Sequence, residues 1–197
     1  MNITAQMVKE LRERTGAGMM DCKKALIEAG GDTEKATSVL REKGIAKAAS
    51  KGGRTTAEGV IATYVHTGDK LGVMVEVNCE TDFVARTDQF KTFVRDIAMH
   101  IAASAPVCIR REEIDSNLVH HERDIYRRQA LNEGKPEKVV DKIIDGRIEK
   151  FYSEVVLLEQ PYVKDNDKSV EDLVKDMIAT LGENINIRRF ARFRLGE

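Results

Sequence analysis

One stretch of the sequence, residues 78–90 (NCETDFVARTDQF), combines side chains that could act on a partner molecule. Asp82 offers a carboxylate that accepts hydrogen bonds, and Phe83, directly behind it, offers an apolar ring. Thr81 is a residue type that caps the first turn of a helix through its hydroxyl group. A corner that presents an acidic and an aromatic side chain together is suited to binding, with Phe83 pushed into an apolar gap of the partner.

The residue patterns of common enzymes are absent from the sequence. Two glycine-rich pieces lack the lysine and the serine or threonine that end a phosphate-binding loop. The cysteines and histidines do not have the spacing of zinc ligands, and Ser104 and Ser116 have no nucleophile-elbow context. His120 and His121 lie in a strongly charged segment, which favours surface histidines over a metal site. We therefore expect a binding protein with no catalytic residue, no metal and no cofactor.

The elements on either side of the corner can be read from their apolar periodicity. Residues 71–79 alternate as a strand, with Val73, Val75, Val77 and Cys79 on one face. After the corner, apolar side chains recur at helical spacing at Phe90, Val94, Ile97 and Ile101. The sequence therefore predicts that Thr81, Asp82 and Phe83 lie at a turn from a strand into a helix.

Residues 1–45 are predicted to form a module of three short helices. Thr4 is expected to cap the first helix, and glycine-rich turns separate the helices. Asp32 or Thr33 caps the third helix, which Gly44 is expected to close because glycine often follows a helix end.

Residues 46–58 are rich in Ala, Lys, Gly and Thr and are predicted to be a linker that begins partly helical. Residues 59–197 then form the core domain. A hairpin over residues 60–79 with a turn at 67–70 starts this domain. Further elements are predicted as helices at 88–105, 116–134 and 138–156, a helix after Ser169, and a strand at 186–195. The predicted fold class is α+β, with an antiparallel sheet packed with helices.

Composition limits the cellular setting. The chain of 197 residues has 33% charged residues and a formal net charge of −1, so no global basic field indicates nucleic acid as a partner. No apolar run is long enough to span a bilayer, and the N-terminus lacks the apolar region of a secretion signal. The odd number of widely spaced cysteines, 3, favours free thiols. We expect a cytoplasmic protein.

Five blocks, in order, resemble the elongation factor Ts family over essentially the whole chain. They are residues 11–26 (LRERTGAGMMDCKKAL), 78–90 (NCETDFVARTDQF), 99–104 (MHIAAS), 133–151 (EGKPEKVVDKIIDGRIEKF) and 181–193 (LGENINIRRFARF). The resemblance implies a guanine-nucleotide exchange factor that binds elongation factor Tu with its GDP and disturbs the Mg²⁺ and phosphate site. GDP then leaves and GTP can bind. It also implies that the three-helix module is similar to ubiquitin-associated domains.

The resemblance further assigns roles to individual residues. Those matching Thr81, Asp82, Phe83 and Val84 dislocate Mg²⁺ from elongation factor Tu. The residues that match other family contacts with elongation factor Tu are Leu11, Met19, Met20 and His100. Adjacent helical residues point about 100° apart, so the two methionines cannot both lie centrally on a core stripe. Whether Leu11 and His100 contact the partner or the chain's own core is left open.

The sequence departs from longer members of the family. Those carry, between the corner and the MHIAAS block, a second half of the core and a projecting coiled coil, whereas here only residues 85–99 link these landmarks. This is the pattern of the short form. We predict a homodimer in which a second copy replaces the missing half, with dimer edges in strands 60–79 and 186–195.

Two other binding functions compete with exchange activity. A nucleic-acid or ribosome-binding protein could use the basic segments 188–194 (RRFARFR) and 47–54 (KAASKGGR), but the balanced net charge argues against direct nucleic acid binding. An adaptor that binds peptides or ubiquitin-like domains through the three helices would leave the corner at Thr81 to Val84 unexplained. No membrane partner is expected.

Overall fold

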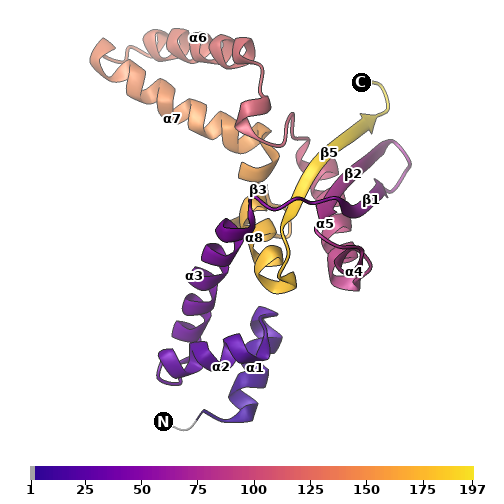
Figure 1. Cartoon of the computed structure of the whole chain (residues 1–197). Coiled ribbons are helices and arrows are strands. Elements are labelled where there is room, and N and C mark those ends of the chain that lie inside the picture. Colours follow the sequence, from indigo (N-terminus) through magenta and orange to yellow (C-terminus); the bar gives the residue numbers. More distant parts are fainter. Residues whose placement is uncertain (1–2) are drawn as a thin grey trace. The chain divides into compact units, whose positions relative to one another are not determined.

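The computed structural model describes residues 3–197 and is a mixed α+β fold, as predicted (Figure 1). Its helices and strands follow in the order α1 Ala5–Thr15, α2 Met19–Glu28, α3 Thr33–Lys51, β1 Glu58–Val65, β2 Leu71–Cys79, α4 Asp82–Ala85, α5 Asp88–Ser104, α6 Ser116–Asn132, α7 Glu137–Val155, β3 Pro161–Tyr162, β4 Asp165–Ser169, α8 Val170–Leu181 and β5 Ile185–Arg194. Short 3₁₀ turns lie at Arg111–Glu113 and Leu157–Glu159.

The chain forms two compact units, and each is assembled from segments that are distant in the sequence. The first unit contains the chain up to Ile61, then Glu76–Val94 and Asp172–Arg188. The second unit contains Ala62–Val75, Arg95–Glu171 and Arg189–Glu197. The predicted domain boundaries at residues 45 and 58 cut the chain into consecutive segments, whereas each of these units combines several separate segments. The predicted boundaries therefore stay a prediction.

The N-terminal helices of the first unit pack around one small apolar core. Thr4 accepts a hydrogen bond at its hydroxyl from the Met7 amide at 3.3 Å, which is the predicted cap of α1. Asp32, rather than Thr33, caps α3, because its Oδ1 accepts from the amides of Glu34 and Lys35. The buried side chains of this core are Val8, Leu11, Cys22, Ala25, Leu26 and Ala36.

Helix α3 is longer than predicted, because it continues through Gly44 to Lys51. Gly44 is buried, and a Cβ atom added there would lie 3.1 Å from the Cβ of Ala179 in α8. The glycine therefore permits a close approach between two helices of the first unit and does not end α3. The first part of the predicted linker, which contains several alanines and lysines, is helical in consequence.

Strands β1 and β2 form the predicted hairpin, and the strand order of the sheet is β1-β2-β5. The alternation in β2 is confirmed, since the predicted face of this strand is fully buried and consists of Val73, Val75, Val77 and Cys79. The turn requires left-handed backbone at Gly68 (φ 93°) and Asp69 (φ 57°). The His66 amide donates to the Leu71 carbonyl at 2.9 Å and closes the hairpin.

Helices α6 and α7 in the second unit lie side by side as an antiparallel pair (Figure 1). Their shared core contains Ala130, Val140, Ile144 and Ile148. Ion pairs bridge the two helices, for example Arg123 to Asp145 at 2.7 Å and Arg127 to Asp141 at 2.6 Å. The helices predicted at 116–134 and 138–156 are therefore present and form a pair that follows the MHIAAS block.

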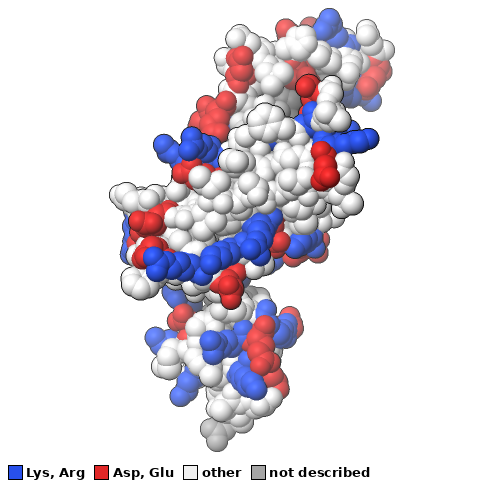
Figure 2. Space-filling model, turned by 90° about the vertical axis from the view of Figure 1, so that its right-hand side faces the viewer, with Lys and Arg blue, Asp and Glu red and all other residues white. Residues whose placement is uncertain are grey.

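The surface mixes both signs of charge. Figure 2 shows acidic and basic side chains interspersed with uncharged surface, in agreement with the net charge of −1. Within residues 3–197, no helix is both long enough and apolar enough to cross a membrane.

Candidate partner-binding site

The corner of the first unit is a short helix between a strand and a longer helix. After β2 ends at Cys79, Thr81 has extended backbone and caps the four residues of α4, as predicted. Its hydroxyl accepts a hydrogen bond from the Val84 amide at 3.5 Å. Thr87 caps the start of the next helix, α5, in the same way, because its hydroxyl accepts a hydrogen bond from the Phe90 amide at 3.2 Å. Threonine hydroxyls therefore cap the starts of two successive helices, α4 and α5.

Phe83 is the most exposed large apolar side chain in the described part of the protein, at 78%. Ala85, two positions later, is 7% exposed and is the buried residue of α4. Phe83 therefore does not pack into the core of its own unit. A single exposed phenylalanine leaves roughly 1.5–3 kcal/mol of burial free energy unused, which a partner can recover.

Asp82 and Val84 flank Phe83 and are half-buried. The Asp82 carboxylate forms an ion pair with Arg86 across one helical turn, with an Oδ2 to Nη2 distance of 2.8 Å. The Arg86 side chain is largely exposed and that of Asp82 partly so, and an ion pair that is open to water contributes little to stability, so a partner's donors can displace it. Thr81 is exposed as well.

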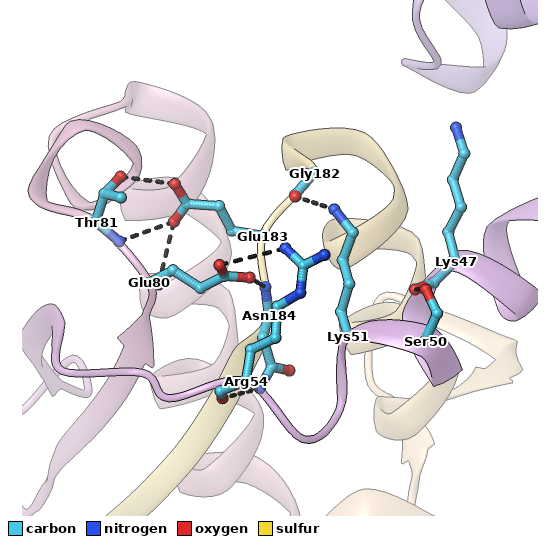
Figure 3. A network of polar contacts seen from close by, with 9 residues as sticks. All are labelled: Lys47, Ser50, Lys51, Arg54, Glu80, Thr81, Gly182, Glu183 and Asn184. Carbon is cyan, nitrogen blue, oxygen red and sulfur yellow. Dashed lines mark hydrogen bonds and ion pairs between the residues drawn. The ribbon is translucent and has the colours of Figure 1, made fainter.

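The backbone of the corner is held by a glutamate from a distant segment, as Figure 3 shows. The Glu183 carboxylate accepts hydrogen bonds from the Glu80 amide at 3.1 Å, the Thr81 amide at 3.0 Å and the Thr81 hydroxyl at 2.6 Å. Glu80 returns the contact, because its Oε1 accepts from the Asn184 amide at 2.6 Å. This bond from the Asn184 amide is the main reason that the pKa of Glu80 is lowered, with Arg54 acting in the same direction.

The end of α3 completes this network. The Asn184 side chain donates to the Arg54 carbonyl at 2.8 Å, and the Arg54 guanidinium lies 3.5 Å from Glu80 Oε2. Lys51 donates to the carbonyl of Gly182, just past the end of α8. Three segments of the first unit, at residues 51–54, 80–81 and 182–184, are therefore bonded to one another directly beneath the corner (Figure 3).

Sequence reasoning did not assign roles to Glu80 and Glu183. The Glu80 amide and the Glu183 carboxylate that accepts from it are 103 positions apart, and no spacing rule connects residues at that separation. Both residues lie inside blocks that resemble the family, and this was the only available signal.

The N-terminal helices present a second apolar surface of the first unit. Met19 and Met20 are 48% and 64% exposed at the start of α2, whereas Leu11 is fully buried in the module's own core. Ile27, about two helical turns after Met20 and so on the same face, is 59% exposed. Leu11 therefore offers no surface to a partner and supports the helices that carry the methionines. Ile27 is an exposed residue that the sequence analysis missed, although its helical spacing from Met20 indicated it.

His100 belongs to the second unit and is fully buried. Its Nδ1 accepts a hydrogen bond from the Val163 amide at 3.2 Å, so the proton is on Nε2, which donates to the Gln160 side-chain oxygen at 2.9 Å. Burial lowers the pKa of His100. His100 therefore packs in the core of its own unit and exposes no surface there, while its predicted role toward a partner stays a prediction.

Comparison with known proteins identifies the family. The family model described as "Elongation factor TS" matches residues 31–197. Elongation factor Ts of Carboxydothermus hydrogenoformans is 63% identical over 195 residues, which cover 99% of this chain and 90% of the relative. Elongation factor Ts of Acetivibrio thermocellus is 62% identical over 195 residues, with 99% and 91% covered. Elongation factor Ts of Geobacter metallireducens is 58% identical over 197 residues, with 100% and 91% covered.

These relatives extend over the N-terminal helices as well as the corner, the Glu183 segment and the helical pair, since nearly the whole chain is aligned. The family model matches most of the chain, and the relatives are about 60% identical to it. Both findings indicate the same family, and the exposed Phe83 on a corner that is held by hydrogen bonds agrees with it. The chain belongs to the elongation factor Ts family.

Proposed function

We propose that this chain is the guanine-nucleotide exchange factor of elongation factor Tu in translation elongation. It binds elongation factor Tu with GDP, disturbs the site that holds Mg²⁺ and the phosphates, and releases GDP so that GTP can bind. The observation that carries this proposal is Phe83, which is 78% exposed on a corner whose backbone is hydrogen-bonded from below. The chain makes or breaks no covalent bond in this process and is not an enzyme.

The energetic logic is reciprocal. A protein that binds the empty GTPase more tightly than the GDP-bound form weakens GDP binding by the same factor. A GTPase holds its nucleotide through phosphate-binding amides, a lysine and Mg²⁺, and Mg²⁺ tolerates little distortion of its octahedral oxygen shell. Small shifts of the elements that carry these ligands therefore destabilise bound GDP far more than they destabilise the empty form.

Phe83 supplies the free energy for such a shift. Burial of its ring between helices of elongation factor Tu gains roughly 1.5–3 kcal/mol, which can hold the partner in a distorted shape. Asp82 accepts hydrogen bonds from donors of the partner once it leaves Arg86, and Thr81 and Val84 complete the contact. No cofactor or metal of this chain takes part.

The N-terminal helices provide docking energy away from the corner. Met19 and Met20 contact the nucleotide-binding domain of elongation factor Tu, and Ile27 extends the same apolar face. Methionine suits this role because its flexible side chain adapts to an irregular surface. Leu11 and His100 act from within the cores of their units, where each holds the elements that surround it.

A second copy of the chain is the proposed partner of the sheet. In the second unit, the strands and the residue after β5 expose large apolar side chains at Val65, Met74, Phe193 and Leu195, with exposed fractions from 52% to 77%. Apolar side chains gathered on one unit at this exposure favour burial against a protein surface, and a symmetric pair buries the same patch twice. We expect a dimer mass in light scattering at micromolar concentration, and a monomer mass would refute the dimer.

The chain acts in the cytoplasm, where elongation takes place, and nucleic acid is not a direct partner. Basic side chains of β5 are partly engaged within the chain, since Arg192 lies 3.1 Å from Glu197 and Arg194 lies 3.5 Å from it. If RNA were the partner, binding would weaken steeply with salt concentration.

Stopped-flow release of a fluorescent GDP analogue from elongation factor Tu tests the function. Wild-type protein is expected to accelerate release by orders of magnitude, and Phe83→Ala to lose most of that acceleration. If both proteins accelerate GDP release equally, the exchange function stands, but Phe83 has no part in it. If neither protein accelerates release, exchange is refuted, and salt-dependent RNA binding becomes the function to measure.

A further inference from the structure

We infer that Glu183 is a positioning residue for nucleotide exchange: its carboxylate holds the backbone of the corner so that Phe83 meets the partner in one orientation. This inference rests on the proposed function and adds a residue to it. Glu183 itself need not touch elongation factor Tu, because it acts through the two residues that precede Asp82.

The three donors that Glu183 satisfies are divided between its two oxygens. Oε2 accepts from the backbone amides of Glu80 and Thr81, and Oε1 accepts from the Thr81 hydroxyl. The hydroxyl bond of 2.6 Å is in the range of a charge-assisted hydrogen bond to a carboxylate. The Glu side chain has an oxygen acceptor at both terminal positions, whereas the amide of Gln has an oxygen at one and an NH₂ donor at the other, so the three donors here select glutamate over glutamine.

The Thr81 hydroxyl connects this contact to α4. It has one proton, which it donates to Glu183, and it accepts from the Val84 amide at 3.5 Å. Glu183 therefore orients the hydroxyl group that caps the helix carrying Phe83. Without the carboxylate, the hydroxyl is free to rotate, and two backbone amides lose their acceptor.

The segment of Glu183 is itself fixed independently of this contact. The Asn184 amide donates to Glu80 at 2.6 Å, and the Asn184 side chain donates to the Arg54 carbonyl at 2.8 Å. Lys51 binds the Gly182 carbonyl on the other side. Removal of the Glu183 carboxylate therefore loosens the corner while its neighbours keep their bonds, and the variant is expected to fold.

The position of Phe83 depends on this backbone because the ring is 78% exposed and its own packing cannot fix it. A binding element held in its bound geometry avoids the ordering cost that a mobile one incurs on association. Phe83 is proposed to displace parts of elongation factor Tu after the two proteins have met. The cost of ordering a mobile corner would therefore slow GDP release and would not weaken the first encounter.

The test measures GDP release from elongation factor Tu over a series of concentrations of the full-length chain. The half-saturating concentration reports docking, and the maximum rate reports the action of the corner. Glu183→Gln keeps the size of the side chain and loses one acceptor, so we expect the maximum rate to fall about tenfold. The half-saturating concentration should change less than about twofold, because the N-terminal helices are untouched. Glu42→Gln, the same change at an exposed position of α3, is the matched control and should behave as wild type.

A double-mutant cycle separates positioning from a general effect on the fold. If Glu183 acts through Phe83, then Glu183→Gln should have less than about a twofold effect in a Phe83→Ala background. A tenfold loss in both backgrounds would show that Glu183 acts elsewhere and would overturn the inference. Glu183→Asp retains the carboxylate on a shorter arm and should restore part of the rate, and no recovery over Glu183→Gln would count against positioning.

Amide hydrogen exchange provides a test that does not depend on exchange activity. Its first measurement uses the wild-type chain alone, so a variant that fails to fold cannot affect it. In the wild-type chain, the amides of Glu80 and Thr81 should be protected, and Glu183→Ala, which removes both acceptor oxygens, should release them while the amide of Val75 in β2 stays protected. Unprotected Glu80 and Thr81 amides in wild type would overturn the inference. If wild type accelerates GDP release, Phe83→Ala does not, and Glu183→Gln equals wild type, then this inference alone fails and the proposed function stands.

Discussion

The corner at Thr81 to Val84 and the cluster around His100 place a ring side chain in opposite environments. At the corner, Phe83 is 78% exposed and the hydrogen bonds lie beneath it, in the backbone. In the second unit, His100 is fully buried and both nitrogens of its ring are hydrogen-bonded. Both residues lie in blocks that resemble the same family. Resemblance to a family therefore does not say whether a residue touches the partner or the core of its own chain.

Phe83→Ala should slow GDP release more than any other substitution considered below. The maximum rate of GDP release should fall by about 10- to 100-fold, which corresponds to the roughly 1.5–3 kcal/mol of burial that the ring gains on binding. The free energy of unfolding, measured by urea denaturation, should stay within about 0.5 kcal/mol of wild type because the ring is exposed.

Val107→Ala provides the control for Phe83→Ala. Val107 is 61% exposed and lies in the second unit, so its truncation removes exposed apolar surface away from the corner. Unchanged release with Val107→Ala and a loss with Phe83→Ala are expected. A loss of stability in Phe83→Ala would contradict the contrast between Phe83 and His100, because it would show that the Phe83 ring supports the fold.

His100→Ala should show the reverse pattern. The substitution leaves the Val163 amide and the Gln160 side chain without their partner and opens a cavity, so the free energy of unfolding should fall by about 2–3 kcal/mol. The maximum rate of GDP release, measured where the variant is still folded, should stay within about twofold of wild type.

The matched control for His100→Ala is His121→Ala, a change at an exposed position of α6 that should leave stability unchanged. If instead His100→Ala slowed release as much as Phe83→Ala while remaining stable, the assignment of His100 to the core alone would be contradicted.

The smallest expected effect is a pH dependence of stability that comes from His100. Burial lowers its pKa in the folded state, so protonation favours the unfolded state as the pH falls below about 6.5, the usual value for the unfolded chain. At higher pH the group is neutral in both states and contributes no pH dependence. Between pH 6.5 and 5.5 the free energy of unfolding should therefore fall, with a contribution of at most about 1.4 kcal/mol per pH unit.

Urea denaturation at a series of pH values, with wild type and His100→Gln, isolates this contribution. The remaining histidines are the same in both proteins, so the difference between the two slopes belongs to His100. Equal slopes would show that His100 does not resist protonation in the folded chain.

The features that the sequence predicted correctly are local ones. The cap at Thr4, the alternation of β2 and the cap at Thr81 depend on neighbouring residues, and each lies where its residue type and spacing place it. The outward direction of Phe83 was suggested by an aromatic residue in a turn, and its exposure agrees with that suggestion.

The features that the sequence did not predict are contacts between distant segments. Gly44 looked like a helix end because glycine often follows one. Its actual role is to make room for Ala179 in another helix, which is distant in the sequence. Glu183 had no visible role because its donors lie near residue 80. His100 was compatible with either environment, and only packing with Gln160 and Val163 decides it. In each case the local pattern was satisfied by more than one tertiary arrangement.

The close approach at Gly44 makes part of the first unit a mechanical linkage. Helix α3 is one continuous rod from Thr33 to Lys51, which meets α8 at Gly44 and binds Gly182 through Lys51. If the N-terminal helices dock on elongation factor Tu as proposed, a displacement of α3 would reach the end of α8, immediately before Glu183, through these two contacts. The helical start of the predicted linker, residues 46–51, thus joins the N-terminal helices rigidly to the segment that holds the corner.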